Sequence, residues 1–387
     1  MVRQEALLGD LCEINVGKTP SRANKSYWAD GVEPWLAIAD MTGNDQILTT
    51  KEKISSLAIK ECNCKQVQAG TVLMSFKLSV GKVAIARRPL YTNEAIAALP
   101  IKNNSKLDEK YLIHALRSID FYAGADRAAK GLTLNKDKLK RIKVPLPTLE
   151  EQKRIAAILD KAAEIKAKRE QVIAKLDDLS QSMFMEMFGD DLKGELLELR
   201  EISVRVTDGT HQAPKWTNSG VPFIFISNIA EDQINFETKK YISNETYDEL
   251  TRNCKIEVGD VLYTTVGSYG NVAVIKDEKK FCFQRHIAQI KPNKERVAPV
   301  FLASMLKSVF VRQQIDKVAK GIAQKTVNLG DLSKVKVICP SIDRQNEFAD
   351  KIMKIDELKL SLQRANNKYK DLLASLQHKA FTTGFNA

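Results

Sequence analysis

The sequence predicts a mixed α/β (α+β) fold made of two related halves, each a globular domain followed by one long helix. Two segments of about forty residues carry apolar residues at heptad spacing, which is typical of long helices that bury one stripe. Each segment follows a proline, Pro147 or Pro340, a residue type that precedes helices but interrupts them from within. The regions before these prolines match each other at an offset of roughly 190 residues, as in an internal duplication.

The duplication divides the chain of 387 residues into four segments. We expect the first globular domain at 1–147, the first long helix at 148–190, the second globular domain at 191–340 and the second long helix at 341–387. Gly189 suits the C-terminal cap of the first helix. A hydrophobic content of 44% is enough for two cores and excludes a disordered chain.

The first long segment has one apolar stripe that only Arg169 interrupts. Its heptad a positions are Ile155, Ala162, Leu176 and Met183, and its d positions are Ile158, Ile165, Val172 and Leu179.

The second long segment repeats this register, with Lys351 as its one defect. Its a positions are Phe348, Ile355, Leu362, Tyr369 and Leu376, and its d positions are Leu358, Ala365 and Leu372. Because matching stripes can bury each other, we expect an antiparallel coiled coil with one domain at each end, a pseudo-twofold arrangement. An ordinary helical hairpin or a dimerisation coiled coil is the alternative.

Inside the globular domains, short β-branched strands alternate with Gly, Pro and Asn turns, and a short amphipathic helix follows at 111–119 and 301–309. This pattern favours a largely non-parallel sheet with some helix interleaved. The clearest matches between the domains are 17–20 with 209–212, 70–75 with 259–264, 79–84 with 268–273, and 93–97 with 284–288.

The charge favours a polyanionic partner, since the net charge is +12 and the isoelectric point is near 9.2. No apolar run reaches the roughly 20 residues of a membrane helix, and the N-terminal residues lack the apolar core of a signal peptide. We therefore expect a cytoplasmic protein without a membrane partner. The 6 cysteines and 4 histidines have no metal-ligand spacing, so we expect no metal site.

Catalytic signatures are missing from the sequence. It has no phosphate-binding loop, no dinucleotide fingerprint, no nucleophile elbow and no H-E-x-x-H pair. Nor is there a paired-carboxylate and lysine arrangement of the kind that a metal-dependent nuclease needs. These observations favour a binding protein with no catalytic residue and no cofactor of its own.

Polar and basic residues gather in the repeated turns of both domains, where lysine and arginine suit phosphates and Asn, Gln, Arg, Ser and Thr suit base edges. In the first domain the candidate DNA-binding residues are Lys18, Thr19, Arg22, Lys77, Ser79, Lys82, Arg87, Lys130, Thr133 and Lys136. In the second they are Thr210, His211, Lys215, Ser268, Tyr269, Asn271, Arg285, His286, Lys325 and Thr326. The turns recur at matching places while their side chains differ, which predicts one scaffold with two sets of reading residues. The alternative is that these are ordinary solvated loops.

Over its whole length the chain resembles the specificity (S) subunit of type I restriction-modification enzymes. The duplicated domain-plus-helix plan, Gly17-Lys18-Thr19-Pro20 and the run V-P-L-P-T-L-E-E-Q-K-R-I at 144–155 carry the resemblance. The second copy of that run, at 339–345, is a weaker match. The second domain has Thr210-His211-Gln212 where the first turn has Lys18-Thr19-Pro20, which leaves the role of that loop less defined.

The resemblance implies that each globular domain is a target recognition domain that reads one half of a bipartite, asymmetric site in double-stranded DNA. The helices would fix the gap between the half-sites and dock two methyltransferase (M) subunits, which would bring S-adenosylmethionine and adenine methylation. A nuclease and translocase (R) subunit, using ATP and Mg, would join to form the restriction enzyme. None of these cofactors would bind to this chain.

Three other classes of function compete with this interpretation. One is a two-headed DNA-binding adaptor that has no methyltransferase partner. Another is a coiled-coil scaffold whose domains bind proteins, for which DNA affinity with a steep salt dependence would not be expected. The last is an enzyme acting alone, which requires catalysis by the purified chain.

Overall fold

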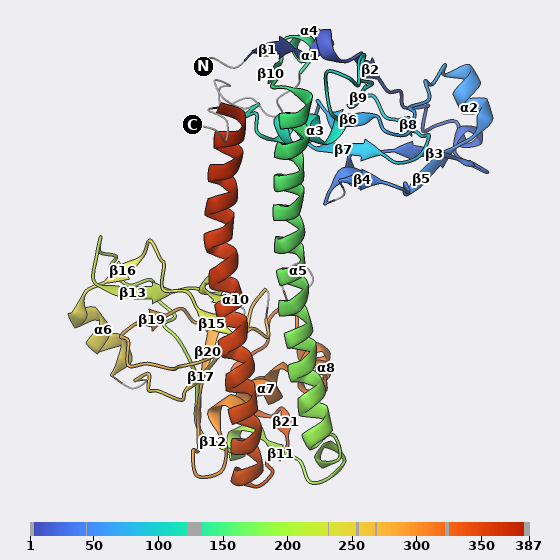
Figure 1. Cartoon of the computed structure of the whole chain (residues 1–387). Coiled ribbons are helices and arrows are strands. Elements are labelled where there is room, and N and C mark those ends of the chain that lie inside the picture. Colours follow the sequence, from blue (N-terminus) through green and yellow to red (C-terminus); the bar gives the residue numbers. More distant parts are fainter. Residues whose placement is uncertain are drawn as a thin grey trace. The chain divides into compact units, whose positions relative to one another are not determined.

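The computed structural model describes residues 4–43, 45–121, 134–230, 232–252, 255–267, 269–321 and 325–382 (Figure 1). Contacts divide the chain into two compact units, Met1–Arg169 with Ala365–Ala387 as unit 1 and Glu170–Arg364 as unit 2. Both divisions fall inside the long helices α5 (Leu149–Phe188) and α10 (Ile342–Thr382), so each unit contains one globular domain and parts of both helices. The domain boundaries expected at 147, 190 and 340 stay a prediction.

Unit 1 is built around a five-stranded sheet in the order β2-β9-β6-β7-β4, with a smaller sheet β5-β3-β8 and the pair β1-β10. Its strands are β1 (Glu5–Leu7), β2 (Asn15–Val16), β3 (Glu33–Leu36), β4 (Gln46–Ile47), β5 (Glu52–Ile54), β6 (Val72–Ser75), β7 (Val83–Ala86), β8 (Tyr91–Thr92), β9 (Ile96–Leu99) and β10 (Lys143–Pro145). Its shorter helices are α1 (Leu8–Leu11), η1 (Lys25–Tyr27), η2 (Ile38–Met41), α2 (Ser56–Glu61), α3 (Glu109–Arg117) and α4 (Lys136–Lys140).

Unit 2 repeats this plan with the sheets β12-β20-β17-β18 and β16-β13-β19 and the pairs β11-β21 and β14-β15. Its strands are β11 (Leu197–Glu198), β12 (Ser203–Asp208), β13 (Val221–Ile224), β14 (Ile229–Ala230), β15 (Gln233–Ile234), β16 (Tyr241–Ile242), β17 (Val261–Thr264), β18 (Val272–Val274), β19 (Cys282–Phe283), β20 (Ile287–Pro292) and β21 (Lys336–Val337). Its shorter helices are η3 (Asp191–Lys193), η4 (Leu199–Glu201), η5 (Ile226–Asn228), α6 (Asn244–Thr251), α7 (Pro299–Lys307), α8 (Val309–Val318) and α9 (Leu329–Ser333).

The two central sheets share their strand register, which confirms the duplication read from the sequence. Met74 of β6 faces Ala97 of β9, and Tyr263 of β17 faces Ala288 of β20. Both smaller sheets contain one parallel pair, β3 with β8 and β13 with β19. Most other pairs among the described strands are antiparallel, so the expected mixed fold with a largely non-parallel sheet is confirmed.

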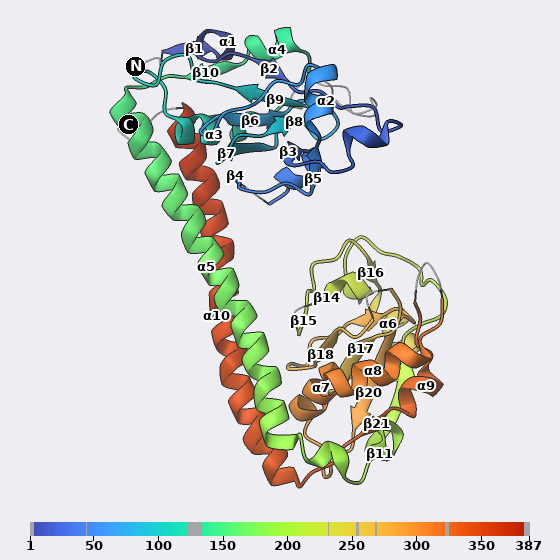
Figure 2. The same ribbon diagram turned by 90° about the vertical axis from the view of Figure 1, so that its right-hand side faces the viewer.

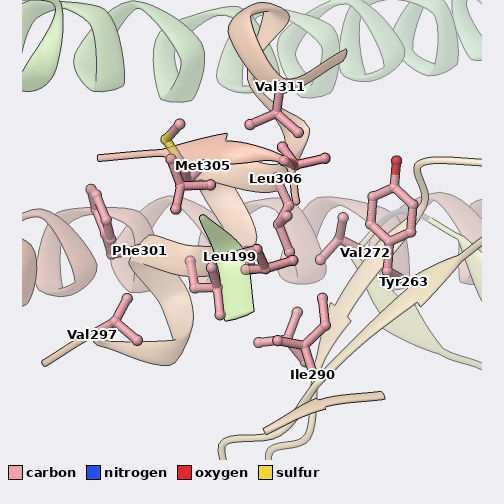
Figure 3. Packing of buried hydrophobic residues seen from close by; sticks show 14 of the residues in the cluster. Leu199, Tyr263, Val272, Ile290, Val297, Phe301, Met305, Leu306 and Val311 are labelled. Carbon is pink, nitrogen blue, oxygen red and sulfur yellow. The ribbon is translucent and has the colours of Figure 1, made fainter. Parts of the chain in front are cut away.

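Each globular core closes on the ends of both long helices. In unit 2 the cluster around Phe301 and Met305 of α7 lies against β17 and β20, and Figure 3 shows their side chains packed with Leu199 and Ile290. Figure 2 shows α7 beside β17 and β18. Four aromatic rings complete this cluster with centroid separations from 4.9 to 6.2 Å, and they belong to Phe184, Phe188, Phe301 and Phe348.

The core of unit 1 also includes residues from the ends of both long helices. Its core includes Ile155 and Leu159 from the start of α5 and Ala380 from the end of α10. The ring of Phe381 packs on Tyr111 of α3 with centroids 5.6 Å apart, as Phe188 packs on Phe301 at 4.9 Å in unit 2. The start of one helix therefore meets the end of the other in each unit, so α5 and α10 pair antiparallel there.

Each long helix is fixed to its globular domain by a buried glutamine near its first turn. Gln152 accepts a hydrogen bond from the Asp108 amide (2.9 Å) and donates to the carbonyls of Lys106 (2.8 Å) and Pro147 (2.9 Å). In unit 2, Gln345 accepts from the Ala298 amide (2.9 Å) and donates to the carbonyls of Arg296 (3.0 Å) and Pro340 (2.8 Å). Both glutamines are fully buried, so all of these polar groups are satisfied without water.

The buried stripe of the helices differs from the expected a/d seam. The a positions Ile155, Ala162, Phe348 and Ile355 are buried as expected. The d positions Val172, Leu179, Leu358 and Leu372 are exposed by 43%, 47%, 49% and 54%. The remaining seam residues are half-buried, namely Ile158, Ile165, Leu176, Met183, Leu362, Ala365, Tyr369 and Leu376.

The second buried row lies at heptad position e in both helices. It includes Leu159, Ile352, Lys359 and Ala380, exposed by 1%, 4%, 7% and 0%. Because each helix end packs on a globular core as well as on the other helix, its buried arc is displaced from a two-helix seam. Glutamine and lysine at e positions hide this row from a search for apolar residues.

Candidate nucleic-acid interface

In both units a glycine lets two loops touch at one end of the central sheet. A Cβ atom on Gly17 would lie 2.1 Å from the Thr92 carbonyl oxygen, and one on Gly209 would lie 2.1 Å from that of Phe283. Both distances are too short for any side chain, so glycine is required at each position. The next amide donates to the same carbonyl, Lys18 to Thr92 at 2.8 Å and Thr210 to Phe283 at 3.1 Å. The two loop pairs are therefore equivalent in backbone and differ in side chains.

The turn between the next two strands joins the same end of each sheet. In unit 1 the Phe76 amide donates to Ala95 (2.9 Å), and in unit 2 the Thr265 amide donates to His286 (2.9 Å). Gly267 donates to the carbonyl of Lys325 (3.0 Å), which adds a fourth segment in unit 2. Glycines with positive φ close these turns at equivalent places, Gly81 at 93° and Gly270 at 94°.

In unit 1 the first loop exposes Lys18 and Thr19. Lys18 Nζ donates to the carbonyl of Cys62 (3.0 Å), and the Thr19 hydroxyl donates to Glu94. Arg22 is 3.7 Å above the Trp28 ring and bonds Glu52 through Nη2 at 2.8 Å, which lowers the pKa of that carboxyl. The loop is thus ordered by its own contacts.

The other unit 1 candidates divide between the two ends of the sheet. Lys77, Ser79 and Lys82 lie in the turn after β6, where Lys82 Nζ donates to Thr42 (2.7 Å). Lys136 begins α4, two residues after Leu134, whose amide donates to Phe76 (2.9 Å), so it lies near the same turn. Arg87 follows β7 at its other end and pairs with Glu109 of α3 (3.0 Å). Lys130 and Thr133 lie outside the described residues.

In unit 2 three candidates, His211, Arg285 and His286, lie on neighbouring loops. His211 Nε2 is 2.9 Å from Asp208, and Arg285 Nε donates to His286 Nε2 (3.3 Å). Burial and the nearby charges of Arg285 and His211 hold the pKa of His286 below its ordinary value. At neutral pH we therefore expect a neutral His286 ring beside an exposed guanidinium, a combination that can bind both bases and phosphates.

The remaining unit 2 candidates have different surroundings. Thr210, Lys215, Lys325 and Thr326 are half-buried or exposed in the same group of loops, and Asn271 donates to the carbonyl of Ile229 (2.9 Å). Tyr269 is only 6% exposed, and its hydroxyl donates to Asp316 of α8 at 2.5 Å. This tyrosine belongs to the core rather than to the exposed loop surface. Ser268 lies outside the described residues.

The sequence pattern did not predict a group beside the first loop in which a cationic side chain lies over a tryptophan ring. In unit 2, Trp216 is 38% exposed, stands edge-on to Phe223 and has Lys240 Nζ 5.0 Å above its ring. In unit 1 the corresponding group is Trp28 edge-on to Trp35, with Arg22 above it. The rarity of tryptophan, with 3 residues in the chain, is the sequence signal that could have identified it.

Metal-ligand clusters and membrane-spanning helices are both absent from the part of the chain that the structure describes. No group of His, Cys, Asp and Glu in the described ranges is arranged to hold a metal ion. Within the same residues, no helix has an apolar stretch long enough to span a bilayer.

These features define a protein with two copies of one recognition scaffold, each closed on parts of two long helices. The family described as the type I restriction modification DNA specificity domain matches residues 4–176 and 194–369. The chain therefore belongs to this family and carries two copies of its domain.

Proteins that are similar to this chain over most of its length are type I restriction enzyme specificity subunits. The chain is similar to the type I restriction enzyme MjaIX specificity subunit of Methanocaldococcus jannaschii, with 22% identity over 355 residues, 86% of this chain and 81% of that protein. It is also similar to the EcoBI specificity subunit of Escherichia coli, with 23% identity over 328 residues, 76% and 69% of the two chains.

Solved structures share the fold. The S subunit of a type I restriction-modification system from M. genitalium has a TM-score of 0.58 and 14% identity, covering 98% of this chain and 96% of that one. A chain from a study of assembly and conformational transition of the type I R-M system has a TM-score of 0.59 and 16% identity, covering 99% and 98%.

Proposed function

We propose that this chain is the DNA sequence-recognition subunit of a type I restriction-modification complex and reads a bipartite, asymmetric DNA site. Each unit would read one half-site through the loops at one end of its central sheet. The observation that carries the proposal is the pair of glycine-closed loop contacts at Gly17 and Gly209. One backbone arrangement presents Lys18, Thr19 and Glu94 in unit 1 but Thr210, His211 and Arg285 in unit 2, as two different half-sites require.

The long helices would set the gap between the half-sites and dock two methyltransferase subunits. Two exposed apolar rows support the docking, Val172 and Leu179 on α5 and Leu358 and Leu372 on α10. Each row consists of two exposed d positions of one helix, so two equivalent partners could each use one helix. Those partners would supply S-adenosylmethionine, and an additional nuclease subunit would supply ATP- and Mg-dependent cleavage.

Methylation mapping tests the proposal directly. The chain is co-expressed with a type I methyltransferase subunit, and adenine methylation is read across the host DNA. We expect one bipartite motif that disappears when this chain is omitted. Complexes that assemble but leave DNA unmethylated and bind no specific sequence would contradict the proposal and favour the protein scaffold.

Side-chain changes then assign the half-sites. Replacing Arg285 and His286 with alanine should relax or abolish one half-site and leave the other unchanged, because the two lie on the loops of unit 2 alone. Lys317→Ala on α8 is the charge-matched control and should change neither. Simultaneous loss of both half-sites would contradict independent reading.

A further inference from the structure

The two units share an edge-on aromatic pair that they use differently. In unit 1 the ring centroids of Trp28 and Trp35 are 5.0 Å apart, with an interplanar angle of 88°. In unit 2 those of Trp216 and Phe223 are 5.0 Å apart, with an angle of 85°. The second ring of each pair belongs to an equivalent strand, β3 or β13, so the two pairs occupy the same place in the duplicated scaffold.

In unit 1 both indole N–H groups are used by the first recognition loop of the same chain. Trp35 Nε1 donates to the carbonyl of Lys18 (3.1 Å), and Trp28 Nε1 donates to that of Ser21 (3.1 Å). The Arg22 guanidinium lies 3.7 Å from the centroid of the Trp28 ring and covers it. These two tryptophans therefore hold the first loop of unit 1 in place.

In unit 2 the equivalent tryptophan lacks these contacts. Trp216 is 38% exposed, and its indole N–H has no hydrogen-bond partner among the residues that the structure describes. Lys240 Nζ lies 5.0 Å from the centroid of the Trp216 ring, and within the described ranges no carboxylate pairs with this ammonium group. Unit 2 thus presents an exposed aromatic ring, a free N–H donor and an unpaired cation beside one another.

The loop that carries Trp216 is itself part of the candidate interface. It begins at Thr210, whose carbonyl accepts a hydrogen bond from the Arg285 amide (3.1 Å). It ends at Thr217, whose amide donates to the carbonyl of Tyr241 in β16 (2.9 Å). Backbone hydrogen bonds therefore fix this loop to the smaller sheet of unit 2 at both ends.

Ring contacts place Trp216 at one particular end of that sheet. The Trp216 and Phe225 ring centroids are 6.4 Å apart. Phe225 follows Ile224, the last residue of β13, whose carbonyl accepts from the Gln284 amide (3.2 Å). The Trp216 ring therefore lies near the end of β13 at which the recognition segment 284–286 begins.

We infer that Trp216 and Lys240 bind the sugar–phosphate backbone of the half-site read by unit 2. The ammonium group and the indole N–H suit phosphate oxygens, because both are hydrogen-bond donors only. The indole ring suits a deoxyribose, because stacked bases of a duplex present only their edges in the grooves. The inference rests on the proposed function and adds a contact that positions the DNA without reading its sequence. Unit 1 would lack this contact, since Arg22 covers Trp28.

The first experiment measures DNA binding by the complex assembled with methyltransferase subunits. Lys240→Ala should weaken binding by about ten-fold and reduce the salt slope by about one, because one phosphate contact is lost. Trp216→Phe should weaken binding by about three-fold, because phenylalanine keeps an apolar ring but has no N–H donor. Both losses should be of the same factor for specific and for random DNA, since a backbone contact carries no sequence information.

Lys279→Ala is the matched control for Lys240→Ala. Lys279 Nζ also lies over an aromatic ring, 4.0 Å from the centroid of Phe236. It precedes β19, however, whereas Gln284 follows that strand, so Lys279 lies toward the opposite end of β19 from the recognition segment. Lys279→Ala should therefore bind specific and random DNA as the wild type does.

The second experiment observes Trp216 itself. Hydroxyl-radical footprinting with mass spectrometry measures the oxidation rate of each tryptophan in the complex, with and without DNA. We expect DNA to slow the oxidation of Trp216 several-fold, because the contact would cover its exposed ring. Trp28 should oxidise slowly in both states, because its ring is already covered by Arg22. Equal oxidation of Trp216 with and without DNA would contradict a direct contact.

The outcomes separate this contact from the proposed function. A changed methylation motif in Lys240→Ala or Trp216→Phe would show that the pair reads bases, which would overturn a backbone contact. Unchanged binding and an unprotected Trp216, in a complex that binds specific DNA, would overturn the inference altogether. Failure of the wild type to bind any specific site would count against the proposed function. Random DNA would still decide the inference, because a backbone contact should protect Trp216 on any sequence.

Discussion

At the scale of single residues, buried polar side chains attach each long helix to its globular domain. Gln152 and Gln345 show how this works, because each side-chain amide makes hydrogen bonds to three backbone groups. The sequence displayed both glutamines inside matching helix starts, but their role required the fold, since Gln152 bonds Lys106 and Asp108 across more than forty residues.

Replacing Gln152 with leucine should destabilise unit 1. The Asp108 amide and the carbonyls of Lys106 and Pro147 would lose these hydrogen bonds, and a group left unsatisfied away from water costs about 1–3 kcal/mol, less what relaxation recovers. We expect a loss of about 3 kcal/mol in chemical denaturation. Gln66→Leu, at an exposed position, is the matched control and should be nearly neutral. Equal stability of the two variants would show that the hydrogen bonds of Gln152 do not stabilise the attachment of α5 to its globular domain.

His114 should make unit 1 sensitive to acid. Burial lowers its pKa, an effect that the hydrogen bond to Asp160 (2.8 Å) only partly offsets. As pH falls through about 6.5, the unfolded chain takes up a proton that the folded chain resists, so stability is lost from there downward. His114→Gln should flatten this loss between pH 7.5 and 5.5 when urea midpoints are compared. His378→Gln, at an exposed site, should keep the wild-type slope.

At the scale of elements, each long helix has two apolar rows with different roles. One row, at positions a and e, packs against the globular cores and the other helix, and part of the second, the d residues Val172, Leu179, Leu358 and Leu372, is exposed. The exposed apolar side chains of the d row bury no surface in this chain, so they do not contribute to its stability. The exposed row is therefore the part of the helices best suited to a partner.

Polar changes on the exposed row should weaken assembly without unfolding the chain. Val172→Ser with Leu179→Ser should remove one of two methyltransferase subunits, since only α5 is altered, and the mass of the complex in solution would report it. Val32→Ser with Leu48→Ser, at positions exposed by 65% and 62% in unit 1, is the control. Retention of two subunits by the α5 variant would place the docking surface elsewhere.

At the scale of the whole molecule, α5 and α10 each continue through residues of both units. The antiparallel pairing brings Asp177 of α5 to Lys359 of α10, where burial acts to lower the lysine pKa but nearby carboxylates raise it overall. A matched insertion in both helices at this level would preserve the heptad positions on either side.

Adding seven residues after Leu176 and after Lys359 should lengthen the gap between the half-sites. Seven helical residues add about 10 Å, which corresponds to about 3 base pairs of DNA. Methylation mapping should therefore return both original half-sites separated by a longer gap. Replacing seven residues without insertion is the control, and an unchanged gap after insertion would refute a helical ruler.

The sequence by itself determined the duplication, the long helices, the strand-bearing halves and the places of the repeated glycine-bearing turns. It could do so because these features depend on local chemistry: glycine where two backbones touch, proline before a helix, and apolar residues at a fixed period. Gly17 and Gly209 are the clearest cases, since a Cβ atom at either would collide with a carbonyl oxygen.

Only the tertiary structure decided which side chains of those elements are exposed. It moved the buried helix row from d to e, placed Tyr269 in the core through Asp316, and set Lys240 beside the exposed ring of Trp216. Each outcome depends on contacts between residues far apart in the chain, where packing and charge override periodicity. The heptad pattern is the same whether the neighbour is another helix or a globular core, so the sequence pattern alone does not distinguish them.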